Sequence, residues 1–157
     1  MEVTNIIRGI SFRITQTMDN VILWPIFECI NVKKYKWYNI ASQNEVWSDS
    51  FGNNLFDKNY YDGKSFYKQI KLKQYIVFIK LQAYWETGEF GEIHTYEEFL
   101  ESDCQILLLI NDCEFVEIYA KDPIIIESIF TNATTNNYED IEYITDDNDG
   151  RTKMDVL

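Results

Sequence analysis

Apolar and polar residues alternate along several short segments in the second half of the chain. Residues 75–84 form a long run rich in β-branched and aromatic side chains, and residues 106–110 and 115–119 are two further apolar runs joined by a polar turn. A last run of this kind covers residues 141–145. The pattern predicts four strands, and the two that the turn joins are expected to pair antiparallel.

Two helices are predicted between these strands from their start signals. Thr95 and Glu98 have the spacing of a capping box. Asp122 followed by Pro123 is typical of a helix start, with a side-chain cap and a proline in the first turn. The order strand, helix, strand, strand, helix, strand over residues 75–145 is that of a ferredoxin-like βαββαβ unit. We therefore expect an α+β fold whose mostly antiparallel sheet carries its helices on one face.

The first half of the chain shows shorter patterns. Residues 6–14 alternate as a half-buried strand. Residues 35–41 and 45–48 are aromatic-rich and favour a hairpin with a polar turn between them. Residues 65–73 place apolar side chains among lysines, which indicates a short helix with a solvated basic face.

Length and composition fit one domain. A chain of 157 residues with 46% hydrophobic content is large enough to bury a single core and is unlike the compositions that stay disordered. We interpret residues 1–74 as N-terminal strand and helix additions to the sheet of residues 75–145. Residues 146–157 are interpreted as an acidic tail.

Neither export nor membrane insertion is predicted. The first five residues lack the basic head and apolar stretch of a secretory signal, and the longest apolar runs are far below the ~20 residues that span a bilayer. Cys29, Cys104 and Cys113 are widely spaced and form no Cys-x-x-Cys pair, so they read as reduced thiols. We expect a cytoplasmic protein.

Charge is distributed unevenly along the chain. Residues 1–80 hold 11 Lys/Arg and 7 Asp/Glu, a balance of +4, whereas residues 81–157 hold 3 and 19, a balance of −16, and the sum is −12. An acidic half repels phosphate backbones and attracts basic proteins, so a basic protein partner is expected and nucleic acid is not. Solubility alone explains the charge equally well.

Residues suited to catalysis or metal binding are few. His94 is the only histidine, so a triad or a multi-histidine metal site would have to be built around one residue, and a structural role beside the helix start is favoured. The segment 146–150 fails the calcium-loop pattern, because Thr145 and Val156 then fall at the first and last ligand positions. An acidic turn partly neutralised by Arg151 is preferred. No catalytic residue, metal site or cofactor is predicted.

Several segments together resemble a known family. They are Arg8-Gly9-Ile10-Ser11-Phe12, Ser102-Asp103-Cys104 before Ile106-Leu107-Leu108-Leu109, Val116-Glu117-Ile118-Tyr119, and the terminal stretch from Ile141 to Thr152 with its Ile-Thr-Asp-x-Asn-Asp-x-Arg-Thr motif. The chain is similar in these segments to an uncharacterised family of small acidic bacterial proteins, classed as a domain of unknown function. The resemblance implies a bacterial cytosolic protein and adds no activity.

The main hypothesis is a non-enzymatic binding protein, such as an immunity or regulatory protein, whose acidic C-terminal half engages a basic partner. Aromatic residues among charges are typical anchors of an interface. The predicted partner-binding residues are Trp85, Glu86, Glu89, Phe90, Glu92, Asp146, Asp147 and Asp149. The alternative is a small carboxylate-based hydrolase or transferase that uses Glu86, Glu89, His94 or the 146–149 cluster. Convergence of these groups in one pocket would favour the enzyme. The oligomeric state is left open.

Overall fold

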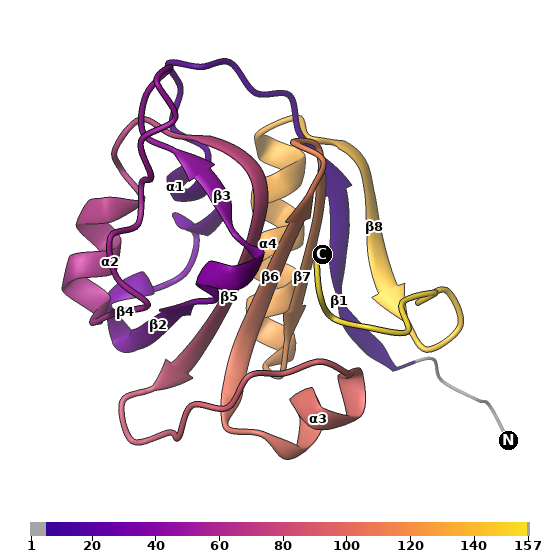
Figure 1. The fold of residues 1–157 in the computed structure, drawn as a ribbon. Coiled ribbons are helices and arrows are strands. Elements are labelled where there is room, and N and C mark those ends of the chain that lie inside the picture. Colours follow the sequence, from indigo (N-terminus) through magenta and orange to yellow (C-terminus); the bar gives the residue numbers. More distant parts are fainter. Residues whose placement is uncertain (1–5, 157) are drawn as a thin grey trace, which may run out of the picture.

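The structure is a computed structural model that describes residues 6–156 (Figure 1). Residues 1–5, on which the expectation of no secretory signal rests, lie outside the described residues. The strands of the described part are β1 (Ile7–Arg13), β2 (Tyr35–Asn39), β3 (Glu45–Trp47), β4 (Tyr60–Tyr61), β5 (Tyr75–Trp85), β6 (Cys104–Asn111), β7 (Phe115–Ala120) and β8 (Glu139–Thr145). The helices are α1 (Leu23–Phe27), α2 (Gly63–Gln69), α3 (Tyr96–Glu101) and α4 (Pro123–Thr135), with short 3₁₀ turns η1 (Val32–Lys34) and η2 (Ala41–Gln43).

The eight described strands form one antiparallel sheet in the order β4-β2-β5-β6-β7-β1-β8, with β3 also paired to β5. The predicted α+β class and antiparallel sheet are confirmed, as is the pairing of the two strands joined by the turn at residues 112–114. The predicted hairpin between residues 35–41 and 45–48 is wrong. β5 is 11 residues long, and β2 and β3 pair with its two ends rather than with each other.

The observed strand order differs from the ferredoxin-like arrangement that was predicted for residues 75–145. In that arrangement the sheet is antiparallel, the third strand of the unit lies between the first and the second, and the fourth lies beside the first. Here β6 lies between β5 and β7, and β1 from the N-terminal half separates β7 from β8. The order of elements along the chain was predicted correctly, but it does not determine which strands become neighbours.

One face of the sheet is covered by α1, α2 and α4, with α4 running behind the strands in Figure 1. Phe66 of α2 is fully buried and stacks on Trp37 of β2 with ring centroids 4.2 Å apart. The helix starts follow from their caps: Asp62 accepts a 2.8 Å hydrogen bond from the Ser65 N–H, and Asp122 accepts a 2.9 Å bond from the Ile124 N–H. This first face is an apolar helix-on-sheet core.

The other face carries α3 and the C-terminal segment, so the expectation that all helices share one face needs correction. Leu107 and Leu109 of β6 point to this second face by strand alternation, opposite to Ile106, Leu108 and Ile110. Phe99 of α3 and Val156 of the tail pack over them. Because the leucines leave an apolar surface uncovered by the long helices, the connection after β5 and the tail fold onto it. Within residues 6–156, no helix has the length and apolarity to cross a membrane.

Candidate functional site

The predicted partner-binding residues come from two connections that end at one edge of the molecule. β5 and β8 run in the same direction, because three antiparallel neighbours separate them in the sheet. Trp85 at the end of β5 and Asp146 after β8 therefore lie at the same end of the sheet, on either side of α3 (Figure 1). We call this surface the acidic end. Its exposed carboxylates are Glu86, Glu89, Glu92, Glu97, Glu98, Glu101, Asp103, Asp146 and Asp147.

The two aromatic residues of the first segment are half exposed and held in place. Trp85 is 44% exposed and stacks on Tyr35 of β2 with centroids 4.6 Å apart. Phe90 is 42% exposed and stacks on Tyr38 at 4.2 Å. Each ring thus has one face on the sheet and the other available to solvent, which suits a pre-organised anchor.

The acidic turn after β8 is neutralised by Arg8 of β1 rather than by Arg151. The Arg8 guanidinium donates to Asp146 at 2.8 Å and to Asp149 at 3.0 Å, and it lies over the Tyr96 ring. Asp149 is the one predicted site residue that the fold places inside, with a side chain only 4% exposed. It also accepts hydrogen bonds from the hydroxyl of Tyr119. Asp149 therefore holds the turn, while Asp147 faces solvent.

Arg151 has a different role, which is to fix the C-terminal segment. Its guanidinium is paired with Glu117 of β7 at 2.9 Å and donates to the Asn111 side chain and to the carbonyl oxygens of Lys153 and Asp155. The tail is thereby tied to the second face of the sheet.

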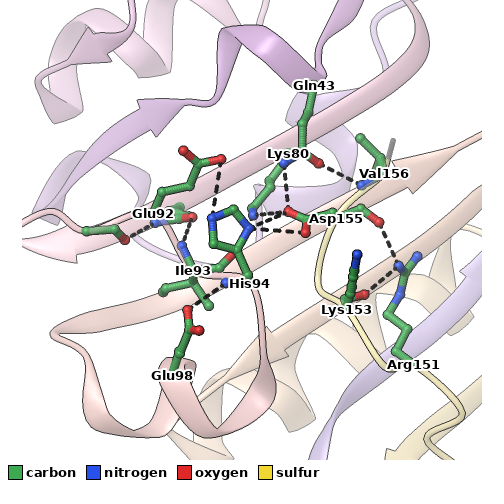
Figure 2. A network of polar contacts seen from close by, with 12 residues as sticks. Gln43, Lys80, Glu92, Ile93, His94, Glu98, Arg151, Lys153, Asp155 and Val156 are labelled. Carbon is green, nitrogen blue, oxygen red and sulfur yellow. Dashed lines mark hydrogen bonds and ion pairs between the residues drawn. The ribbon is translucent and has the colours of Figure 1, made fainter.

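A polar cluster around Lys80 lies on the second face of the sheet, at the middle of β5 (Figure 2). Lys80 is fully buried in the middle of β5, and its ammonium donates to Asp155 at 2.7 Å and to the carbonyl of Ile93. Asp155 also accepts from the Gln43 amide at 2.7 Å and lies 3.1 Å from Nδ1 of His94. Four segments far apart in sequence thus meet at one carboxylate.

The electrostatics of this cluster favour the charged form of Asp155. Burial alone would raise the pKa of this carboxyl, but hydrogen bonds from Lys80, Gln43 and His94 lower the pKa to about 2. An unpaired ammonium at the position of Lys80 would be strongly unfavourable, so Asp155 is the counter-ion that the buried charge needs.

Glu92, His94 and Asp155 are the residues best placed to hold a metal ion, since their ligand atoms lie within 4.8 Å of one another. The hydrogen bonds and ion pairs that these three side chains already make favour a structural role. Asp155 Oδ1 already accepts from Lys80 and Gln43, and the two ring nitrogens of His94 face different carboxylates, Asp155 at 3.1 Å and Glu92 at 3.9 Å. A cation there would also lie beside the Lys80 ammonium. The arrangement fits a structural ion-pair network better than a metal centre.

Cys29 and Cys104 are placed poorly for nucleophilic chemistry. Burial raises the pKa of Cys104 to about 12 and the pKa of Cys29 to about 11. A thiolate is the reactive form, so this burial disfavours the reactive state of both residues.

Sequence reasoning missed Lys80, Gln82 and Asp155. Gln82 is fully buried, accepts from the Ile93 N–H at 3.1 Å and donates to the Gly91 carbonyl at 2.9 Å, so it fastens the loop before α3. Lys80 and Gln82 alternate with the apolar Ile79, Leu81 and Ala83, which would indicate a solvent-facing side of the strand. The available signal was their position at the centre of the longest strand, where a polar side chain is usually covered and needs partners.

Comparison with known proteins gives a family and a relative. The profile of a family described as "Protein of unknown function (DUF2691)" matches residues 7–155. The chain is also similar to the "Uncharacterized protein YncE" of Bacillus subtilis (strain 168), with 36% identity over 152 residues that cover 95% of this chain and 99% of the relative. No solved structure matches significantly.

Proposed function

Because the chain belongs to this family of proteins of unknown function, its relatives assign no activity, and we propose that it is a non-enzymatic binding protein for a basic protein partner. The partner contacts the acidic end, as in an immunity or regulatory protein. The observation that carries the proposal is the convergence of the loop after β5, of α3 and of the turn after β8 on one end of the sheet.

The charge of this surface supports the proposal. Two cations near the acidic end are occupied: Arg8 is paired with Asp146 and Asp149, and Lys121 donates to the carbonyl of Ser102. The side chains of Glu89, Glu97 and Asp147 make no hydrogen bond or ion pair within residues 6–156. Such a field accelerates encounter with a positively charged protein and selects against acidic partners.

The positions of the carboxylates favour binding over carboxylate-based catalysis. Glu86 lines a cavity bordered by α2 and β2, whereas Asp149 lines a different groove over β1, β7 and β8. The acid and base of a hydrolase must reach the same bond. Carboxylates spread over separate hollows are better suited to contacting a large, complementary surface.

The test compares two variants with equal charge change. In the first, Glu89→Gln, Glu97→Gln and Asp147→Asn neutralise the acidic end. In the second, Asp19→Asn, Glu28→Gln and Glu45→Gln neutralise exposed carboxylates elsewhere. Proteins retained from a bacterial extract by the immobilised wild type are identified, purified and titrated by calorimetry.

We expect a basic protein whose affinity falls about tenfold, or ~1.4 kcal/mol, in the first variant and stays unchanged in the second. Its affinity should also fall as salt is raised. A partner that is acidic, or that binds both variants like the wild type, contradicts the proposal.

A further inference from the structure

A cavity of about 420 Å³ lies where η1, β2, β4 and the first turn of α2 meet. Its lining includes the lysines Lys33, Lys34, Lys36 and Lys64, and the aromatic residues Tyr35 and Tyr60. We call it the lysine pocket. Apart from Glu86, its lining residues belong to the N-terminal half of the chain. It borders the surface assigned to the basic partner at Glu86 and at Trp85, which stacks on Tyr35.

Tight backbone packing assembles this pocket. A Cβ at Gly63 would lie 2.1 Å from the carbonyl oxygen of Lys33, so only glycine allows the start of α2 to approach η1 so closely. This approach places Lys64 beside Lys33 and Lys34. Buried stacking of Phe66 on Trp37 then fixes α2 against β2.

The lysines of the pocket differ from the arginines of the same chain. All three arginines are ion-paired: Arg8 with Asp146 and Asp149, Arg13 with Glu114 and Asp140, and Arg151 with Glu117. No ion pair within residues 6–156 involves a lysine of the pocket. The carboxylate of Asp62, which also lines it, is engaged as the cap of α2. The carboxylate of Glu86 also lines the pocket, so four lysines stand against two carboxylates, and the hollow keeps a net positive charge in a protein with 26 acidic residues.

We propose that the lysine pocket binds a small ligand bearing two or more phosphate groups. Lysine ammonium groups are point charges that suit phosphate oxygens from several directions. The ring of Tyr60 is 45% exposed and contacts the ring of Tyr38 in a tilted arrangement, with centroids 5.2 Å apart. It offers a flat apolar wall on which a ring attached to the phosphates can stack. The ligand is therefore an oligophosphate, free or carried by a nucleotide.

The experiment titrates the full chain at low salt by calorimetry with inorganic phosphate, pyrophosphate, tripolyphosphate and ATP, without added metal. Affinity should rise by at least tenfold from phosphate to tripolyphosphate, because each added group meets a further lysine. Lys34→Gln with Lys64→Gln should weaken tripolyphosphate binding at least tenfold. Lys68→Gln with Lys73→Gln removes the same charge from exposed positions that do not line the pocket, and should change the affinity less than twofold.

Tyr60→Ala separates the two sources of the ligand. If the ring of Tyr60 contacts a base, ATP loses affinity in this variant while tripolyphosphate does not. If the affinities of ATP and tripolyphosphate are both unchanged, the ligand is a free oligophosphate.

Equal weakening of tripolyphosphate binding by both lysine variants would overturn the proposal, as would no binding of tripolyphosphate at millimolar concentration. Tighter binding of a 20-nucleotide single strand than of tripolyphosphate would assign the surface to nucleic acid instead, and self-association that phosphate reverses would assign it to a second copy of the chain. Because the partner assay uses other residues, it can fail while this one succeeds.

Discussion

The two faces of the sheet are closed by different chemistry. On the first face, α1, α2 and α4 bring regular apolar stripes against the strands, and the helices satisfy their own backbone hydrogen bonds. On the second face, much of the cover is irregular chain: the loop before α3 and the C-terminal segment. An irregular segment cannot be buried unless its backbone polar groups find partners. Lys80 and Gln82 of β5 supply those partners to Gly91 and Ile93.

This difference has a functional consequence. The segments of the acidic end rest on the second face, where the apolar cluster around Leu107 and Leu109 is combined with buried, hydrogen-bonded polar side chains. Their positions therefore depend on these hydrogen bonds as well as on apolar contact. Asp155 is the common point, because it joins β5, the η2 turn, the loop before α3 and the tail. Disturbing this carboxylate should therefore loosen the second face while leaving the first intact.

The largest effect is expected for Asp155→Ala. Removing the counter-ion leaves the Lys80 ammonium buried, which should lower the free energy of unfolding by about 3 kcal/mol in urea titrations at pH 7. Amide hydrogen exchange should accelerate first at Met154 and Val156 of the tail. Lys80→Met fills the same space without a charge and should be milder.

The double variant Asp155→Ala with Lys80→Met shows whether the two residues are energetically coupled, and in which direction. If the loss in Asp155→Ala comes from the unpaired ammonium, adding Lys80→Met should restore part of the lost stability. Losses that simply add would show that the carboxylate acts through the tail alone.

The second effect concerns acid. The folded-state pKa of Asp155 is about 2, below the ordinary value of 3.8. A depressed pKa contributes stability above the ordinary value, and that contribution is lost as pH falls from about 4 to about 2. The expected loss is about 2 kcal/mol for this group. It should appear as the difference between wild type and Asp155→Ala narrowing over this range, measured by urea unfolding at several pH values.

A first-face variant provides the control for this titration. Phe66→Ala removes a fully buried ring and should be destabilising by about 4 kcal/mol. Because no ionisable group is involved, its difference from wild type should stay constant from pH 4 to pH 2. A difference that narrows equally for Phe66→Ala would mean that the acid effect is global and does not report on Asp155.

The contrast between the faces also explains what the sequence could predict. The helix starting at Pro123 was predicted from the cap at Asp122, because such signals are local and both residues lie side by side. The position of β1 between β7 and β8 was not, because strand order depends on contacts between distant segments. The side on which α3 lies follows from the uncovered surface of Leu107 and Leu109, which a strand pattern alone does not reveal.

For the candidate site, the acidic segments were recognisable but their support was not. Glu86, Glu89 and Asp147 lie on the surface, as their charge predicted. Asp149 was expected beside them and lies inside, because Arg8 is 141 residues away in the chain and only folding brings the two together. Partners of buried polar residues are set by tertiary contacts, so pairs such as Lys80 and Asp155 are not encoded in local spacing.

The smallest effect is expected from salt. No ion pair in residues 6–156 joins the lysine pocket to the acidic end, and the two regions meet only where Glu86 and Trp85 border the pocket. Like charges at the acidic end then repel over a Debye length of ~10 Å at 0.1 M ionic strength. Raising the salt from about 0.02 M to 0.2 M should screen this repulsion and stabilise the isolated protein by under ~1 kcal/mol, seen as a small rise in melting temperature.

The variant that combines Glu89→Gln, Glu97→Gln and Asp147→Asn should have a higher melting temperature at low salt. Its melting temperature should rise less with salt, because the repulsion is already reduced. Neutralising Asp19, Glu28 and Glu45 instead should leave the slope nearly unchanged. If the melting temperature of the wild type does not change with salt, the carboxylates of the acidic end do not repel one another appreciably, and a basic partner would have no repulsion to relieve. The charge of the acidic end would then be explained by solubility.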